Sequence, residues 1–282
     1  MKIWLHNKIV PESRARVSVL DRGFLYGDGV YEAVRVYQGH IFRAEQHWKR
    51  LNASLKSIHM KIPWSHDYLT RACLATIRAN NMSEALVRVT ISRGAGDVGL
   101  DPRSAQRPTL TVLAVPISKD LPQLWKKGIK IAIVKIRRNP VRSLNPAIKH
   151  TNSLNSILAK IEAIQAGAFE GVFLNLEGFL AEGTISNIFM VKHGVLKTPS
   201  LDCGILDGVT RRLVIKLAKD SKIKTLETHI SLKELLAADE IFLTSTTMEV
   251  MPVTHIGTRL TKPPGPVTRL LQKKFIASIC PQ

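Results

Sequence analysis

Short apolar strands alternate with helical segments in both halves of the chain, and this alternation limits the possible folds more than any other feature. Apolar residues recur at helical spacing from Ala44 to His59. Stretches rich in Val, Leu, Ile and Thr fill Ala85 to Ser92 and Thr109 to Val115. Elements that alternate in this way form mixed sheets with helices packed on them. The sequence therefore predicts an α/β (α+β) fold.

The 282 residues are enough for two domains, and a stretch near the middle of the chain is typical of a link between them. Pro116 to Gly128 holds two prolines. We expect an N-terminal α/β domain over residues 1–117, a linker over 118–129 and a C-terminal domain over 130–282. A strand is also expected from Ala15 to Leu20, where apolar residues alternate.

Composition excludes several classes of protein. No apolar run approaches the ~20 residues of a membrane span, and the first residues lack the features of a signal peptide. The cysteines Cys73, Cys203 and Cys280 form no close pairs, which argues against a disulfide framework or a zinc site. We therefore predict a cytoplasmic protein and no metal centre.

The net charge of +19 permits a nucleic-acid or membrane-surface role. However, the basic residues are spread along the whole chain, no run of five or more occurs, and aromatic residues make up only 6%. We therefore predict neither nucleic-acid nor membrane binding. A solvated basic surface, or a preference for anionic ligands, agrees better with this distribution.

One lysine stands at a position suited to chemistry. Lys149 lies in a loop directly ahead of a helical run from Ser153 to Gln165. A lysine in a partly desolvated cleft can supply a neutral amine, which attacks a carbonyl or moves protons. The alternative is a solvated surface lysine, because the chain holds 41 Lys and Arg residues.

Other segments could bind a phosphorylated aldehyde cofactor. The segment Asp207-Gly-Val-Thr210 has the form of a helix N-terminus, whose free N–H groups bind phosphate. Ser245-Thr246-Thr247 offers further donors, Arg50 a fixed charge, and Glu182 a carboxylate for a pyridine nitrogen. Each also has an ordinary interpretation: a capped helix, a turn or a solvated side chain.

Six stretches together make the chain resemble the class IV, or fold-type IV, aminotransferases that use pyridoxal 5′-phosphate. They occur in the family's order and spacing from residue 1 to about residue 275. These are Asp21-Arg-Gly-Phe-Leu-Tyr-Gly-Asp-Gly-Val-Tyr-Glu, His47-Trp-Lys-Arg-Leu, Ile148-Lys-His-Thr-Asn, Ala181-Glu-Gly-Thr-Ile-Ser-Asn-Ile-Phe, Gly204-Ile-Leu-Asp-Gly-Val-Thr-Arg and Phe242-Leu-Thr-Ser-Thr-Thr-Met-Glu-Val-Met-Pro-Val.

The resemblance implies a role for each candidate residue. Lys149 is the Schiff-base lysine and proton shuttle, and Glu182 pairs with the pyridine nitrogen. The phosphate is held by Arg50, Val209, Thr210 and Thr246. The residues that bind the substrate are Tyr31, Arg88, Thr246 and Thr247. The resemblance further implies a homodimer with its active site at the domain interface, closed by a neighbour's loop that corresponds here to Arg93 to Pro102.

The substrate is less clearly indicated, because the motifs are mixed. Arg35, Arg88 and the loop from Arg93 are similar to branched-chain aminotransferases, whereas Tyr31-Glu-Ala-Val and Ile185-Ser-Asn are nearer to D-amino acid transaminases. Aminodeoxychorismate lyases tend to carry a threonine where Ala33 stands. We rank branched-chain L-amino acid transamination first, with 2-oxoglutarate as the second substrate in a ping-pong transfer. D-amino acid transamination ranks second, and the lyase third. The non-enzyme alternative is a basic binding protein that kept the fold.

Overall fold

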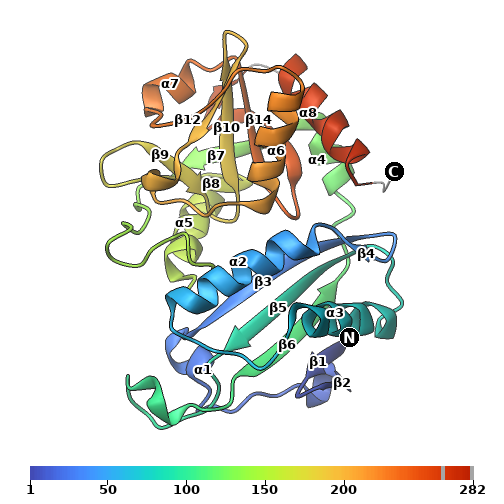
Figure 1. Cartoon of the computed structure of the whole chain (residues 1–282). Coiled ribbons are helices and arrows are strands. Elements are labelled where there is room, and N and C mark those ends of the chain that lie inside the picture. Colours follow the sequence, from blue (N-terminus) through green and yellow to red (C-terminus); the bar gives the residue numbers. More distant parts are fainter. Residues whose placement is uncertain (262–263, 280–282) are drawn as a thin grey trace. The chain divides into compact units, whose positions relative to one another are not determined.

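The computed structural model describes residues 1–261 and 264–279, and the chain divides into two compact units. The first unit comprises Met1–Ile117 together with the short segment Ile148–Ser153. The second comprises Ser118–Ala147 and the chain from Leu154 onward (Figure 1). The main segment of the first unit ends at Ile117.

The first unit is built on one antiparallel sheet. Its six strands, all within the described residues, run in the order β2-β1-β6-β5-β3-β4. Its elements are β1 (Lys2–Leu5), β2 (Lys8–Pro11), η1 (Glu12–Arg14), α1 (Arg22–Tyr26), β3 (Gly29–Tyr37), β4 (His40–Ile41), α2 (Ala44–Ser57), α3 (His66–Ala79), β5 (Ala85–Ser92), η2 (Pro102–Ser104) and β6 (Thr109–Val115).

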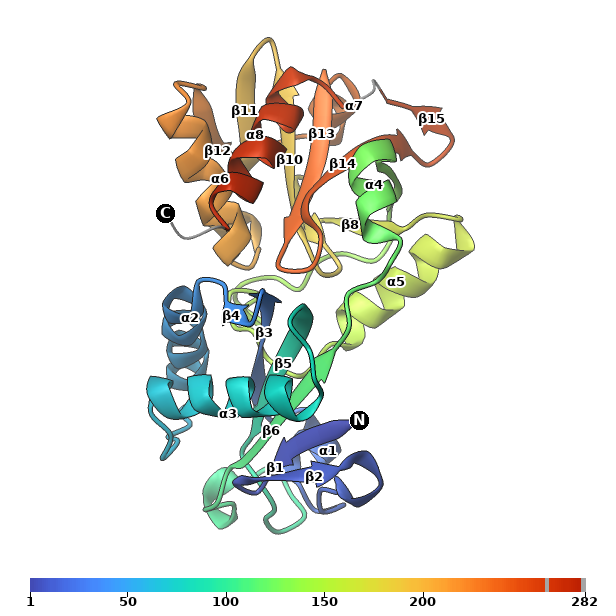
Figure 2. The same ribbon diagram turned by 90° about the vertical axis from the view of Figure 1, so that its right-hand side faces the viewer.

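Helices α2 and α3 cover one face of this sheet, and the unit's core lies between them and the strands (Figure 2). On β3, Val30, Val34 and Val36 alternate into this core, as strand geometry requires. Trp48 and Leu51 of α2 face them at helical spacing. The opposite face of β3 carries Tyr31, which was predicted to bind substrate, together with Ala33 and Arg35.

The second unit contains a mixed sheet. In its described residues the strand order is β12-β11-β10-β13-β14-β7-β8-β9, with β15 paired to β14. The pairs β11–β12, β14–β7 and β7–β8 are parallel. Its elements are α4 (Leu121–Lys127), β7 (Ile129–Ile133), α5 (Leu154–Gln165), β8 (Glu170–Leu174), β9 (Leu180–Gly183), β10 (Asn187–Lys192), β11 (Val195–Pro199), η3 (Leu201–Cys203), α6 (Val209–Asp220), β12 (Thr225–Thr228), α7 (Leu232–Leu236), β13 (Glu240–Ser245), β14 (Glu249–Ile256), β15 (Arg259–Leu260) and α8 (Pro266–Ala277).

Helices pack on this second sheet at two places. Helices α6 and α8 lie against each other and against β13, whereas α5 lies on β7 and β8 (Figure 1). The contact of α5 is close because Ala159 and Ala163 are small and fully buried. A side chain added at Gly171 of β8 would meet the Ala159 carbonyl at 3.0 Å. The predicted mixed sheets with packed helices are therefore confirmed.

Three expectations differ from the structure: the strand at residues 15–20, the linker, and the unit to which Lys149 belongs. Residues 15–20 form no strand, because their alternating apolar side chains find no partner strand, and Val17 and Val19 are exposed. The expected linker 118–129 contains helix α4, which packs on β14 and belongs to the second unit. Cys280 lies outside the described residues.

The third difference concerns Lys149, which was expected in the C-terminal domain. Segment 148–153 is grouped instead with the first unit, because it pairs with β3. Thr151 N–H donates to the Gly29 carbonyl at 2.9 Å, and Val30 and His150 form an antiparallel bridge. The lysine is thereby fixed to the N-terminal sheet. In the part of the chain that the structure describes, no helix has both the length and the apolar character needed to span a membrane.

Candidate active site

Lys149 is held through its backbone at two points. Its carbonyl accepts a hydrogen bond from Tyr31 N–H at 3.0 Å, and its own N–H donates to Ser54 Oγ of α2 at 3.0 Å. The side chain is half-buried, and Nζ lies 4.4 Å from the centroid of the Tyr31 ring. The amine that the sequence singled out is therefore positioned by both a strand and a helix, over an aromatic side chain of the sheet.

Tyr31 meets a second cation from the neighbouring strand. Arg88 lies on β5 opposite Ala33, and its guanidinium carbon is 3.7 Å from the centroid of the Tyr31 ring. The charge of Lys149 lowers the pKa of the Tyr31 hydroxyl against the opposing effect of burial, and Arg88 lowers it further. Tyr31, Arg88 and Lys149 thus form one cluster whose phenol gives up its proton more readily than usual.

A further arginine lies on the same face of β3. Arg35 is buried, pairs with Glu84 at 2.8 Å, and packs its guanidinium 4.6 Å from the Tyr37 ring centroid. Its Nε and Nη1 atoms are buried without a hydrogen-bond partner. Unsatisfied buried donors of a charged group are costly. This face of the sheet therefore offers cationic donors suited to a carboxylate.

Arg50 belongs to α2, which covers the other face of β3, and it is part of a buried ionic group. Its Nε and Nη2 donate to the two oxygens of Glu32 at 2.7 and 2.8 Å, and His47 Nδ1 lies 2.8 Å from Glu32 Oε2. Burial would raise the pKa of Glu32, but the Arg50 charge and the hydrogen bonds lower it to about 2. The residue predicted to hold phosphate is thus oriented by a carboxylate with no exposure to solvent.

In the second unit, Glu182 lies at the centre of a hydrogen-bonded group at the end of β9. Its Oε1 accepts from Arg138 Nε and Nη2 at 3.0 and 2.9 Å, and its Oε2 accepts from Leu206 N–H at 2.9 Å. Asn187 Nδ2 approaches Oε2 at 3.3 Å. Both oxygens of the Glu182 carboxylate therefore accept hydrogen bonds, and a guanidinium pairs with one of them.

The N-terminus of α6 lies beside this group. The helix begins at Val209, and its first N–H groups have no intrahelical acceptor. Gly208 stands at the N-cap position and has no side chain that could accept from them. A Cβ at Gly208 would lie 2.1 Å from Asn187 Oδ1. Only glycine therefore permits this approach. Val209 and Thr210, both buried, present a helix N-terminus of the kind that binds phosphate.

Thr246 and Thr247 lie in the turn between β13 and β14 and are half-buried. The register pairs Asn187 with Thr244, so this end of β13 adjoins the strand that carries Asn187. Thr244 Oγ1 is buried without a partner. The second unit thus brings the predicted Glu182, Val209 and Thr210 to the surroundings of Asn187, and an unsatisfied hydroxyl lies next to it.

The family assignment follows from comparison with known proteins. The model of the family Amino-transferase class IV matches residues 29–256, which is most of the chain. The chain is a class IV aminotransferase. The family and the enzyme class, transaminase, were both predicted from the six motifs, and both predictions are confirmed.

Curated relatives of this class IV aminotransferase include two transaminases with different substrate names, and a relative from Bacillus subtilis is named an aminodeoxychorismate lyase. A putative branched-chain-amino-acid aminotransferase of Methanocaldococcus jannaschii is 46% identical over 98% of this chain and 95% of its own length. A D-alanine aminotransferase of Listeria monocytogenes is 36% identical over 99% of this chain and 96% of its own length. The same two substrate classes were ranked first and second from the sequence.

Solved structures agree along nearly the whole chain. The Escherichia coli branched-chain amino acid aminotransferase superposes with a TM-score of 0.92 at 32% identity, covering 98% of this chain and 93% of that one. A branched-chain amino acid aminotransferase of T.th., solved with pyridoxamine 5′-phosphate, has a TM-score of 0.91 at 32% identity and covers 98% and 92%. The class IV fold predicted from the sequence is confirmed.

The sequence analysis did not identify three residues that contact predicted site residues, namely Glu32, Arg138 and Asn187. Glu32 had a detectable signal, because a carboxylate at a core-facing position of an apolar strand requires buried partners. Asn187 also had one, because it stands in the same quoted motif as Glu182. Arg138 had none, since it contacts Glu182 only through the tertiary fold. All three orient a predicted site residue.

Proposed function

We propose that this class IV aminotransferase uses pyridoxal 5′-phosphate to move an amino group from a branched-chain L-amino acid to a 2-oxo acid such as 2-oxoglutarate. The arrangement of Lys149 with Tyr31 and Arg88 on one rigid sheet carries the proposal. The name of the relative that is 46% identical supports the substrate class. Lys149 and Glu182 are the residues to which we assign catalytic roles.

The residues of the second unit fit such a cofactor. When bound, pyridoxal phosphate supplies an electrophilic aldehyde and an electron-withdrawing ring. We assign the phosphate to the N–H groups of Val209 and Thr210, the Thr210 hydroxyl and Thr246, where Gly208 leaves the helix end uncapped. Glu182, which pairs with Arg138, is assigned to the ring nitrogen. Arg50, aligned by Glu32, is assigned to the phosphate as a fixed positive charge.

Lys149 moves the proton in this proposal. Its neutral amine removes the proton from the substrate α-carbon and later returns one. The Tyr31 hydroxyl, whose pKa is lowered by Lys149 and Arg88, accepts hydrogen bonds from the amine and steadies it between the two transfers. The two backbone bonds at Lys149 keep the amine over this face while it shuttles.

Carboxylate recognition is assigned to the arginines. Arg88 contacts Tyr31, and the buried Arg35 has two donors without a partner. An arginine binds a carboxylate through parallel hydrogen bonds. We assign Arg88, Tyr31, Thr246 and Thr247 to substrate binding and expect Arg35 to assist with a dicarboxylic 2-oxo acid.

A homodimer remains part of the proposal, and helix α5 supports it. Five apolar side chains on its outer face are between 43% and 62% exposed. They recur at helical spacing and form an apolar stripe, the kind of surface that marks a protein interface. The stripe comprises Leu154, Ile157, Leu158, Ile161 and Ile164. A cytoplasmic location also remains a prediction.

D-amino acid transamination is the second candidate, favoured by the relative that is named a D-alanine aminotransferase. A half-reaction panel separates the two. The purified protein, loaded with pyridoxal phosphate, is mixed with L-leucine, D-alanine or aminodeoxychorismate, and the loss of the yellow absorbance is followed. We expect the fastest conversion with L-leucine. Faster conversion with D-alanine would replace the substrate assignment, and pyruvate release from aminodeoxychorismate would favour the lyase. A protein that rejects the cofactor would support a binding role instead.

A further inference from the structure

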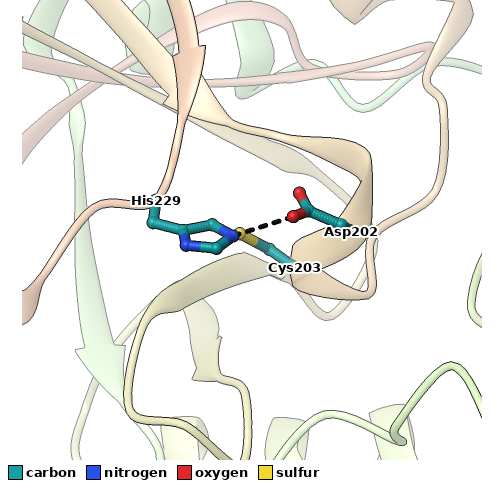
Figure 3. A group of neighbouring side chains, drawn as sticks. All are labelled: Asp202, Cys203 and His229. Carbon is teal, nitrogen blue, oxygen red and sulfur yellow. Dashed lines mark hydrogen bonds and ion pairs between the residues drawn. The ribbon is translucent and has the colours of Figure 1, made fainter.

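A second group of reactive side chains lies in the second unit, at the ends of two parallel strands. Asp202 and Cys203 follow β11 in the short helix η3, and His229 directly follows β12. Strands β11 and β12 are parallel, so the segments that follow them emerge at the same edge of the sheet. Figure 3 shows the imidazole, the thiol and the carboxylate facing one another there.

The distances within this cluster suit a bound metal ion. His229 Nε2 lies 2.9 Å from Asp202 Oδ2, and the nitrogen, sulfur and oxygen atoms all lie within 4.8 Å of one another. Donors around a tetrahedral zinc ion are about 3.3–3.8 Å apart, given bond lengths of about 2.0–2.3 Å. The 2.9 Å contact is shorter than this spacing, so the imidazole and the carboxylate would separate slightly to admit the ion. A solvent water would complete the coordination, because His229 and Asp202 are exposed.

The surrounding residues hold the three donors in place. Ser200 N–H donates to the Thr228 carbonyl at 3.2 Å, which ties the ends of the two strands together. The Ser200 hydroxyl hydrogen-bonds to Asp202, and the Phe179 ring stacks on His229 with centroids 4.8 Å apart. Partners that orient metal ligands in this way strengthen binding.

Two other roles agree less well with the geometry. A cysteine nucleophile needs access to substrate, yet Cys203 is only 1% exposed. An exposed Asp202–His229 ion pair by itself contributes little to stability. The Cys203 thiol packs in the apolar core beside Phe173 and Ile205, but packing alone does not account for the imidazole and the carboxylate that lie next to it. A cation that takes sulfur, nitrogen and oxygen donors accounts for all three side chains.

We propose that Asp202, Cys203 and His229 form a binding site for a divalent metal ion of the zinc type. Thiolate and imidazole donors favour zinc or cobalt over magnesium or calcium. Binding displaces the thiol proton to solvent, and the ion enters from the exposed side of His229. Because the donors come from the segments after β11 and β12, the ion would stabilise this edge of the sheet. The site also lies three residues before Leu206, whose N–H binds Glu182.

Metal titration tests the proposal on the full chain. The protein is treated with a chelator, dialysed and titrated with ZnCl₂ in a calorimeter, and with CoCl₂ while the visible spectrum is recorded. We expect one ion per chain, cobalt bands typical of tetrahedral coordination with a thiolate, and an increase in melting temperature with zinc. A tenfold excess of MgCl₂ should not compete.

Variants decide whether these residues bind the ion. His229→Asn and Asp202→Asn change exposed side chains and should leave the protein folded, with zinc affinity lowered about 100-fold or more. His193→Asn, at another exposed histidine of the same unit, is the matched control and should bind as the parent does. Cys203→Ala should remove the thiolate band, whereas Cys73→Ala should keep it. Zinc binding that is equal in the parent and in both exposed variants would overturn the proposal, as would a parent that binds no zinc.

Discussion

Lys149 and Tyr31 are joined at both backbone and side chain: the lysine carbonyl accepts the tyrosine N–H at 3.0 Å, while the lysine Nζ lies 4.4 Å from the tyrosine ring centroid. The strand that positions the aromatic ring thereby also positions the amine. A shift of β3 at Tyr31 would therefore disturb the hydrogen bond that positions Lys149.

Replacing Lys149 should abolish transamination. Lys149→Ala removes the amine that moves the α-proton, and we expect turnover to fall by about 10²–10⁴-fold or more. Borohydride treatment followed by peptide mass analysis should place the cofactor on Lys149 in the parent only. Lys49→Ala, an exposed lysine of α2, is the control and should leave turnover unchanged. Full activity in Lys149→Ala would remove this residue from its assigned role.

The ionisation of Tyr31 should depend on its two cations. Because Lys149 and Arg88 lower the pKa of the Tyr31 hydroxyl, an ultraviolet titration of the parent minus Tyr31→Phe should give a phenol that ionises below the ordinary value of 10.0. Arg88→Gln should move that ionisation to higher pH, and Arg78→Gln should not. A difference titration that is the same in both arginine variants would contradict this electrostatic coupling.

Loss of Glu32 should destabilise the first unit. Glu32→Gln leaves the Arg50 guanidinium buried without its counter-charge, which should cost about 3–5 kcal/mol in urea unfolding. Glu45→Gln, an exposed carboxylate on the same helix as Arg50, should change stability far less. A cost for Glu32→Gln no larger than that of Glu45→Gln would mean that the buried ion pair is not structural.

The same buried group should make the protein sensitive to acid. The pKa of Glu32 is about 2 in the folded state and 4.5 in the unfolded chain, so its contribution is complete above pH 4.5 and is lost as the pH falls toward 2. Burial lowers the pKa of His47 below 6.5, so the unfolded state takes up a proton first and stability begins to fall below that pH. Unfolding at a series of pH values should therefore give a lower free energy at pH 4 than at pH 7, and His47→Gln should reduce the difference.

Gly208 should tolerate no side chain. The Cβ of Gly208→Ala would lie 2.1 Å from Asn187 Oδ1, so either the start of α6 or the Asn187 side chain must move. We expect pyridoxal phosphate affinity to fall at least tenfold, measured by fluorescence titration. In an Asn187→Ala background the same substitution should cost less, because the clashing oxygen is gone. Equal costs in the two backgrounds would show that the contact does not matter.

The apolar stripe of α5 should govern oligomeric state. Ile157→Glu with Ile161→Glu places two charges on this face without touching the buried Ala159 and Ala163. Light scattering after size exclusion should give a dimer for the parent and a monomer for the variant. Gln165→Glu, an exposed residue near the end of the same helix, is the charge control. A parent that is monomeric at micromolar concentration would remove the homodimer from the proposal.

The sequence by itself determined the class of fold and the family, and it supplied the candidates for the principal site residues. Helical and strand periodicities are local, and residues such as Lys149 and Glu182 stand in short motifs that can be recognised without knowing their neighbours. The strand predicted from periodicity at residues 15–20 is absent, because an alternating pattern specifies a strand only when a partner strand is available.

Only the tertiary structure decided which residues act on one another. Glu32 contacts Arg50 and His47 of the helix that follows it, Arg138 reaches Glu182 from 44 residues earlier in the chain, and His229 meets Asp202 across 27 residues. Segment 148–153 likewise joins the first unit because its hydrogen bonds are to β3, not because of its place in the sequence. Such pairings depend on sheet order and helix packing, which no local pattern records.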